Sequence, residues 1–176
     1  MVHYKQASSQ HELEQILQLQ QTNLKKNLAV QEQEKEGFLT VEHSLGILKE
    51  MNDVWGHIIA LENKKVVGYA LCMHPKFAES IELLKPLFHE TNKVLKGKKN
   101  YMVMGQICVA GSHRGKGIFR NLYATMLKNL PKGFDTIITE VDGKNKRSLG
   151  AHLAIGFKTL KVYPSHGREW HLISLE

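Results

Sequence analysis

Residues 101–130 contain the feature that most restricts the fold. An apolar run leads into a glycine-rich segment, and an amphipathic stripe follows. The run Tyr101–Val109 is apolar at both alternating sets of positions, which is typical of a central strand buried on both faces. Apolar residues then recur at helical spacing from 118 to 130, where Pro131 ends the pattern. The segment predicts a strand, a tight loop and a helix at the centre of the fold.

The rest of the chain predicts one mixed α+β domain over residues 1–176, without repeats or linkers. Ser9 and Glu12 have the spacing of a capping box at the start of the first helix. A charged loop is expected at 32–40. The further expected strands are 3–7, 55–63, 65–75, 134–141, 158–164 and 169–176, and the further helices are 9–28, 41–52, 76–95 with a break near Lys85, and 145–156.

Composition limits the function in three ways. A chain of 176 residues can bury one sizeable core, and its net charge of +7 favours an anionic partner. The first residues contain no signal-peptide core and no later run has membrane-helix length, so we expect a cytoplasmic protein without a membrane partner. Cys72 and Cys108 lie in apolar runs without metal-ligand spacing, so we expect buried packing residues, no disulfide and no metal site.

The segment VAGSHRGKGIFRNLY has the composition of a phosphate-binding loop. A Walker loop needs four residues between its first glycine and its Gly-Lys pair, and then Ser or Thr. This segment has three residues between those glycines, and Gly117 follows the pair. A dinucleotide fingerprint needs a third glycine where Arg120 stands. An anion nest at a helix N-terminus remains, which suits a pyrophosphate. The alternative is a glycine-rich turn whose basic residues are merely solvated.

Two motifs resemble those of the GNAT superfamily of acyl-CoA-dependent N-acyltransferases. The first is 114–119, RGKGIF, which matches the family's pyrophosphate loop except at Phe119, where a small residue is usual; we expect Phe119 to point into the core. The second is NKRSLGAHLAIGF, in which Asn145, Ser148, His152, Gly156 and Phe157 occupy the positions of the family's later motif.

The resemblance implies a GNAT fold: a mixed central sheet of about six to seven strands flanked by helices, with a splay between the fourth and fifth strands. It implies acetyl-CoA as the acyl-donor cosubstrate. The backbone of Ile107, Cys108 and Val109 would hold the pantetheine arm, and Asn145 and Ser148 would also bind the cofactor. The pyrophosphate would bind at Arg114, Gly115, Lys116, Gly117, Ile118, Phe119 and Arg120.

Acetylation of an amine asks for a base that deprotonates the acceptor and an acid for the departing thiolate. Glu140 lies near the end of the expected strand 134–141 and is the candidate base, although pairing with a local cation is an equal alternative. His152 occupies the position where the family often has the tyrosine that protonates the thiolate. A satisfied core histidine is the alternative.

The sequence therefore predicts an N-acetyltransferase that transfers the acetyl group of acetyl-CoA directly to an amine in a ternary complex. The alternatives are a nucleic-acid binding module that uses the basic loop, for which no aromatic stacking pattern is present, and a GNAT fold that binds acyl-CoA without catalysis. The amine stays open, although the first helices and the segment 75–100 would line its side. We expect a monomer or a homodimer.

Overall fold

The computed structural model describes residues 1–31, 33 and 38–176, so residues 32 and 34–37 of the expected charged loop lie outside the described residues. The strands form one mixed sheet in the order β1-β2-β3-β4-β5-β7-β6. The chain has two compact units, and the prediction of a single domain stays a prediction. Unit 1 comprises Met1–Leu28, Leu39–Met73 and Met104–Asn129, and unit 2 comprises Ala29–Phe38, His74–Val103 and Leu130–Glu176. No helix in the described part of the chain is long and apolar enough to cross a bilayer.

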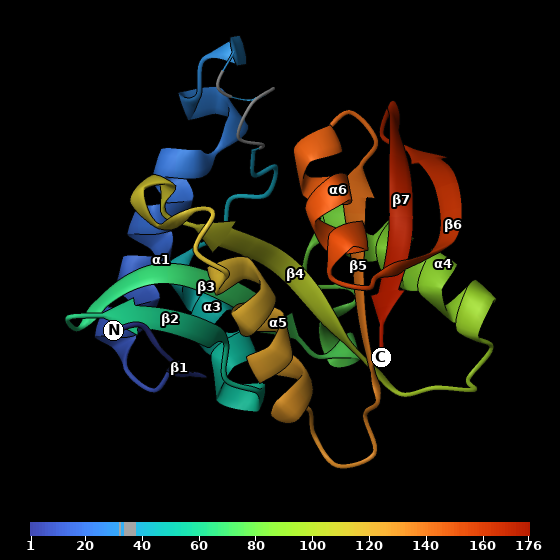
Figure 1. Cartoon of the computed structure of the whole chain (residues 1–176). Coiled ribbons are helices and arrows are strands. Elements are labelled where there is room, and N and C mark those ends of the chain that lie inside the picture. The colour runs from blue at the N-terminus through green and yellow to red at the C-terminus, as the bar shows by residue number, and fades with distance from the viewer. Residues whose placement is uncertain (32, 34–37) are drawn as a thin grey trace. The chain divides into compact units, whose positions relative to one another are not determined.

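Unit 1 is a layer of strands covered by helices (Figure 1). Antiparallel pairing joins β1 to β2 and β2 to β3. Its elements are β1 (His3–Gln6), α1 (Gln10–Asn23), α3 (Leu45–Val54), β2 (Ile58–Glu62), β3 (Lys65–Met73), the part of β4 (Tyr101–Val109) from Met104 onward, and α5 (Ile118–Lys128). The expected capping box is confirmed, because Ser9 and Glu12 bond reciprocally at the start of α1.

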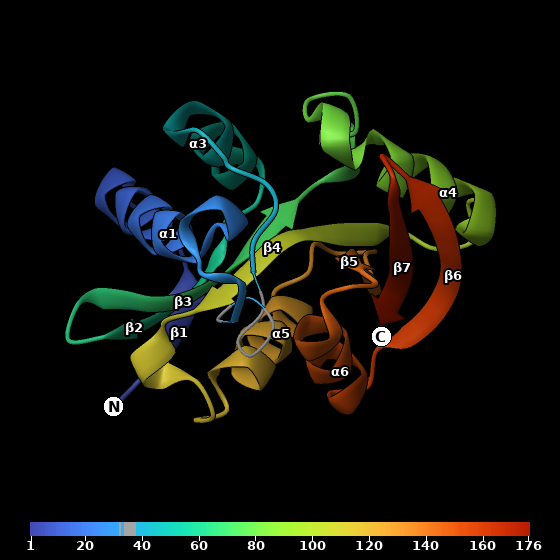
Figure 2. The ribbon, with the colours of Figure 1, turned by 90° about the horizontal axis from the view of Figure 1, so that it is seen from above.

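The helices of unit 1 cover both faces of β3. Helices α1 and α3 lie on one side of the strands and α5 on the other (Figure 2). All residues of β3 after Lys65 are therefore buried. Gly68 lets α5 approach closely, since an added Cβ would lie 3.1 Å from Ile118 Cγ2, 3.2 Å from the Cys108 carbonyl oxygen and 3.4 Å from Leu122 Cδ1.

Unit 2 is built around β5 (Thr136–Asp142), β6 (Lys158–Ser165) and β7 (Arg168–Leu175). β7 pairs antiparallel with both β5 and β6. The first three residues of β4 pair with β5 in parallel. Helices α4 (Lys85–Leu95) and α6 (Lys146–Ala154) lie on opposite faces of these strands (Figure 2).

The expected elements are confirmed in type, and their ends differ for local reasons. Tyr101–Val109 is a strand with the predicted bounds. The expected helix over 76–95 is an α-helix only from Lys85. Pro86 lies in its first turn, where backbone N–H groups make no intrahelical hydrogen bond, so the lack of an N–H in proline costs nothing there. The helix expected from 41 begins at Leu45, because the side chain of Ser44 caps it.

Replacing Gly68 by alanine should destabilise the protein by about 1–3 kcal/mol, because the new methyl group meets a backbone carbonyl that cannot move aside. Urea unfolding measures the change. Gly150→Ala is the matched control: this glycine lies inside α6 with open space beside it, so alanine should stabilise the helix by up to about 1 kcal/mol. Equal unfolding free energies for Gly68→Ala and the wild type would contradict the close approach.

Candidate active site

The loop after β4 is shaped by two glycines in the left-handed region. Gly115 and Gly117 have φ angles of 73° and 76°, which L side chains rarely adopt. A Cβ added at either position would meet no atom within 4 Å. Gly117 precedes α5 and offers no side-chain cap to the N–H groups of the first turn. Open space beside an uncapped helix N-terminus suits an anion.

Arg114 braces this loop within unit 1. Its Nε donates a hydrogen bond to the Val109 carbonyl at 3.2 Å, and its Nη2 donates to Asn23 Oδ1 at 2.7 Å. The guanidinium therefore ties the loop to the end of β4 and to the last residue of α1. Neither of these two partners is charged, so these bonds leave the positive charge of Arg114 at the loop, beside the exposed Lys116 and Arg120.

A second brace joins the loop to β2. Nε2 of His113 lies 3.0 Å from Glu62 Oε2, and Nδ1 of His113 lies 2.8 Å from Ser112 Oγ. The hydrogen bond from His113 holds the pKa of the Glu62 carboxyl below its usual value. Two side chains thus fix the loop before its glycines.

The first residues of α5 differ in burial. Ile118 is buried beside Gly68. Phe119 is only partly buried, and its ring meets the edge of Tyr123 at a centroid distance of 5.3 Å. The expectation that Phe119 points into the core is therefore met only in part.

The end of β4 alternates between the interior and the surface. Cys108 is buried, while Ile107 and Val109 are partly exposed. Burial raises the pKa of the Cys108 thiol to about 12, and burial does the same to Cys72. Both cysteines are therefore neutral packing residues at pH 7, as expected.

In unit 2, Glu140 is a largely buried carboxyl near the end of β5. The hydroxyl of Tyr163, on β6, donates a hydrogen bond to Glu140 Oε2. Burial raises the pKa of Glu140 to about 7, and the hydrogen bond from Tyr163 opposes that rise. The hydrogen-bond partner of Glu140 is therefore the neutral phenol of Tyr163 and not the local cation of the alternative. A carboxyl that titrates near pH 7 can accept a proton there.

His152 is buried on α6, where its Nδ1 donates to the Ser148 carbonyl at 2.7 Å and its ring meets Phe157 at 5.1 Å. Burial lowers the pKa of His152 to about 4, so the imidazole is neutral at pH 7. These contacts favour the alternative of a satisfied core histidine. Asn145 Oδ1 accepts from the Ser148 N–H and caps α6, and Asn145 Nδ2 donates to the Phe38 carbonyl.

Glu140 and His152 lie on opposite faces of the unit 2 strands. Glu140 is opposite Leu172, which is opposite Lys161, so these three side chains share one face. Lys161 pairs with Glu90 of α4, which assigns α4 to that face. Figure 2 shows α6, the helix to which His152 belongs, on the other side. The two candidate residues therefore cannot act on the same atom from one side.

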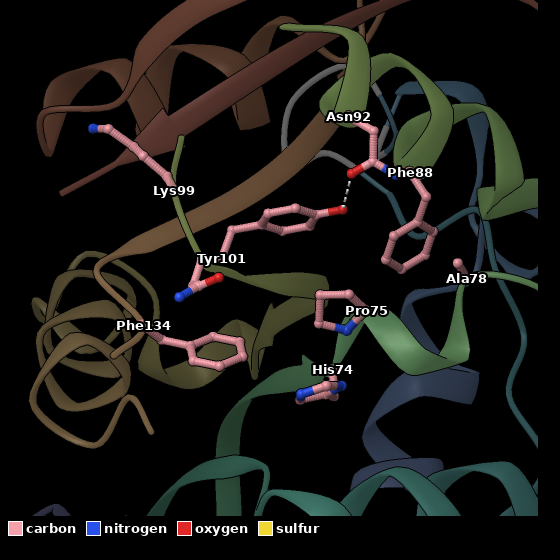
Figure 3. A pocket seen from close by; sticks show the side chains of 9 residues that line it. His74, Pro75, Ala78, Phe88, Asn92, Lys99, Tyr101 and Phe134 are labelled. Carbon is pink, nitrogen blue, oxygen red and sulfur yellow. Dashed lines mark hydrogen bonds between the residues drawn. The ribbon is translucent and has the colours of Figure 1, made fainter. Parts of the chain in front are cut away.

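A hollow of about 340 Å³ opens in unit 2 at the start of β4 (Figure 3). His74 and Phe134 form one wall as a tilted ring pair, 5.4 Å between centroids, and the Tyr101 hydroxyl donates to Asn92 Oδ1 at 3.0 Å. The lining residues are His74, Pro75, Ala78, Phe88, Asn92, Lys99, Asn100, Tyr101 and Phe134. Most of them come from the segment expected to line the acceptor side, and none is a predicted site residue.

Sequence reasoning missed Tyr163 and Asn23, because each acts through a partner distant in the chain. Tyr163 lies 23 positions from Glu140, and Asn23 lies 91 positions from Arg114. Alternation along 158–164 could have assigned Tyr163 and Lys161 to one face. No local sequence pattern predicts the hydrogen bond between Asn23 and Arg114.

The raised pKa of Glu140 predicts a specific pH dependence of stability. Because the pKa rises from 4.5 in the unfolded chain to about 7 in the folded one, the folded protein holds the proton more tightly. The contribution of Glu140 is therefore complete below pH 4.5 and is lost as the pH rises to 7.

Urea unfolding of the wild type and Glu140→Gln between pH 4.5 and 8 measures this contribution. The wild type should lose stability relative to Glu140→Gln as the pH rises. Buried histidines such as His152, with its pKa of about 4, act in the opposite direction, but they are present in both proteins and cancel in the difference. A difference that stays flat would contradict a buried carboxyl at position 140.

Comparison with known proteins agrees with this geometry. No curated protein sequence matches the chain. Three solved structures with TM-scores of 0.64 to 0.65 share the fold. An acetyltransferase of the GNAT family from Bacillus cereus is 15% identical, with 100% of this chain and 97% of that one covered and a TM-score of 0.65. An Arabidopsis thaliana protein in complex with the bisubstrate analogue CoA-Ac-MVNAL is 16% identical, with 99% and 98% covered and a TM-score of 0.64.

The third structure, yncA from Salmonella typhimurium with its cofactor acetyl-CoA, is 16% identical, with 100% of this chain and 94% of that one covered and a TM-score of 0.64. The model of the acetyltransferase (GNAT) family matches residues 13–157. That match includes the nest of Gly115 and Gly117 and the carboxyl of Glu140. The chain therefore belongs to the GNAT family of acetyltransferases.

Proposed function

We propose that this chain transfers the acetyl group of acetyl-CoA directly to an amine. The observation that carries the proposal is the loop of Gly115 and Gly117, whose open space and uncapped helix start suit a pyrophosphate. Lys116 and Arg120 would add charge-assisted hydrogen bonds to the phosphate oxygens. The similar proteins solved with acetyl-CoA or a CoA conjugate support this choice of donor.

Glu140 is the proposed general base. With a pKa of about 7, the Glu140 carboxyl is partly ionised at pH 7, and the ionised form can accept the proton that an ammonium must lose before its nitrogen attacks. Tyr163 orients the carboxyl through its hydrogen bond. We assign no proton transfer to His152, because its imidazole is neutral and donates to a backbone carbonyl.

Transfer without a covalent enzyme intermediate is the form that the cysteines support. A thioester exchange through the protein would need a thiolate, and the thiols of Cys72 and Cys108 are neutral at pH 7 because burial raises each pKa to about 12. In direct transfer Glu140 takes one proton from the ammonium, the amine nitrogen bonds to the acetyl carbon, and the C–S bond breaks. The second proton on nitrogen passes to the departing sulfur, so that CoA leaves as the thiol.

The double variant Lys116→Ala/Arg120→Ala should bind acetyl-CoA about tenfold or more weakly, because two exposed cations are lost from the proposed phosphate site. Isothermal titration calorimetry measures the affinity. Lys128→Ala removes an exposed cation from the opposite end of the same helix and should change it less than about twofold. No saturable binding of acetyl-CoA to the folded wild type would overturn the proposed function.

Glu140→Gln should lower kcat by about 10²-fold or more with whichever amine an acetyl-CoA screen by free-thiol release identifies. Tyr163→Phe should retain the base but raise its pKa, since the phenol's hydrogen bond favours the carboxylate. The acidic limb of the kcat/KM profile should therefore move to higher pH in Tyr163→Phe. A limb that stays in place, or moves to lower pH, would argue against Glu140 as the titrating base.

A further inference from the structure

The hollow in unit 2 has walls of aromatic rings. Phe88 on α4 and Tyr101 at the start of β4 are each at most 7% exposed, whereas His74 and Phe134 are half-buried and remain open to a ligand. Figure 3 shows the four rings around one space, with Phe134 and Phe88 on opposite sides of it. The volume of about 340 Å³ lies at the lower end of the range for small-molecule sites. The walls therefore suit a small, flat aromatic group.

The side chains that line the hollow also offer hydrogen-bond donors and an acceptor. Nδ1 of His74 accepts the Lys76 backbone N–H at 3.1 Å, and burial lowers the pKa of His74, so the neutral ring carries its proton on Nε2. Asn100 Nδ2 donates to the Gly133 carbonyl at 3.0 Å, which leaves Asn100 Oδ1 as an acceptor. Asn92 Oδ1 already accepts from a phenol, which leaves Asn92 Nδ2 as a donor. A ligand edge with both kinds of group would find partners here.

Lysines lie beside the hollow in the turn after α4. Lys96 and Lys98 are exposed, and their backbone N–H groups both donate to carbonyls of the last turn of α4, which fixes this turn. Neither lysine has an ion-pair partner in the part of the chain that the structure describes, whereas Lys99, which lines the hollow, pairs with Glu176. Two cations next to the hollow are therefore available to an anion.

The acidic groups nearby are engaged by other residues. Among the described residues that line the hollow, none is acidic. Glu176 pairs with Lys99, and the carboxylate of Asp135 accepts from the Thr136 hydroxyl at 2.7 Å. Lys132 adds an exposed cation on the same loop as Asp135. The charge beside the hollow thus favours an anionic ligand.

We propose that this hollow is a nucleotide-binding site, in which a nucleobase lies between the aromatic rings and its phosphate binds Lys96 and Lys98. The inference goes beyond acetyl transfer and does not rest on it. Nucleobases stack on aromatic side chains, histidine included, and their edges are bound by donors and acceptors of polar side chains. A phosphate one sugar away from the base would form charge-assisted hydrogen bonds with the two ammonium groups.

The combination of groups favours a nucleotide over other flat ligands. An aromatic hydrocarbon would contact the rings but would make no use of Asn92 and Asn100. An aromatic carboxylate would also use the lysines, but it brings no donor to Asn100 Oδ1. A nucleoside phosphate provides the ring, the mixed edge and the anion together.

The fold supplies what the lysine run 93–99 lacks in the sequence. No aromatic residue lies between these lysines, so local pattern gives no stacking platform. His74 follows β3, Phe88 belongs to α4 and Phe134 precedes β5, and the fold brings these three rings to Tyr101, next to the lysine run. A basic segment without aromatic residues thus acquires them from distant parts of the chain.

NMR of protein labelled with ¹³C,¹⁵N-histidine tests the site with adenosine 5′-monophosphate (AMP). Before any ligand is added, His74 should report a proton on Nε2. AMP should move the carbon-bound ring-proton signals of His74 upfield, because the base stacks beside them, and it should bind about fivefold or more tightly than adenosine, which lacks the phosphate. No shift with AMP, equal affinities for AMP and adenosine, or an equally strong shift with phenylacetate would each overturn the inference.

Two lysine pairs separate the phosphate contact from general attraction to a basic protein. Lys96→Ala/Lys98→Ala should remove the advantage of AMP over adenosine. Lys64→Ala/Lys65→Ala, at the exposed turn between β2 and β3 of unit 1, is the matched control and should retain it. Each pair includes one lysine in the left-handed region, Lys96 with a φ of 50° and Lys64 with a φ of 63°. Equal losses in both double variants would overturn the inference.

Phe134→Leu tests the stacking face. Leucine keeps an apolar side chain at this half-buried position but removes the aromatic ring, so AMP should bind about tenfold more weakly. Urea unfolding checks that the variant retains the stability of the wild type. An AMP affinity that is unchanged in folded Phe134→Leu would contradict stacking at this wall.

A short oligoadenylate identifies the source of the nucleotide. The same His74 shifts with an affinity about tenfold or more above that of AMP would assign the site to single-stranded nucleic acid, and an affinity within about twofold would assign it to a free nucleotide. Oligoadenylate that binds without moving the His74 signals would overturn the inference.

Failure of this inference is distinguishable from failure of the proposed function. In Lys116→Ala/Arg120→Ala the affinity for acetyl-CoA should fall, whereas the AMP-induced shift of His74 should persist. Loss of both together would show that AMP reports on the loop after β4, and the inference would be wrong. Acetyl-CoA binding without any His74 shift by AMP would leave the proposed function intact and remove only the nucleotide site.

Discussion

The burial of β3 on both faces is the constraint on which unit 1 depends. Because α1 and α3 cover one face and α5 the other, the strand has no solvent side, and each helix must approach closely. Gly68 provides that approach for α5. The start of α5 is the proposed anion-binding end, so the packing of Gly68 also bears on where the loop of Gly115 and Gly117 lies relative to β3.

Desolvation has a comparable role in unit 2, where it acts on chemistry more than on packing. Glu140 would be an ordinary carboxyl in water, and burial beside β6 and β7 raises its pKa toward neutrality. Tyr163 limits the rise by donating a hydrogen bond to the carboxylate. The same physical effect lowers the pKa of His152 and removes it as a proton donor at pH 7. The strands of unit 2 thus have Glu140, which can act as a base, on one face and His152, a packing residue, on the other.

Hydrogen bonds join the buried side chains of Tyr69, Gln106, Gln20 and His43 in one series. Three of its side chains are satisfied by one another or by a backbone carbonyl, and the direction of each bond follows from the next. Among the described residues, Nε2 of His43 is the buried side-chain atom that has no hydrogen-bond partner.

Local patterns in the sequence determined the order of strands and helices, the bounds of Tyr101–Val109, the capping box of Ser9 and the glycines of the loop, because each depends on neighbours a few residues away. The two motifs likewise indicated the GNAT family, which the family model confirms. The place of Glu140 near the end of the expected strand 134–141 made it the candidate base. Only the tertiary structure decided that Arg114 braces the loop, that Glu140 pairs with Tyr163 and that Nε2 of His43 has no hydrogen-bond partner within the described ranges. Hydrogen bonds and desolvation depend on residues distant in the chain, which no local pattern encodes.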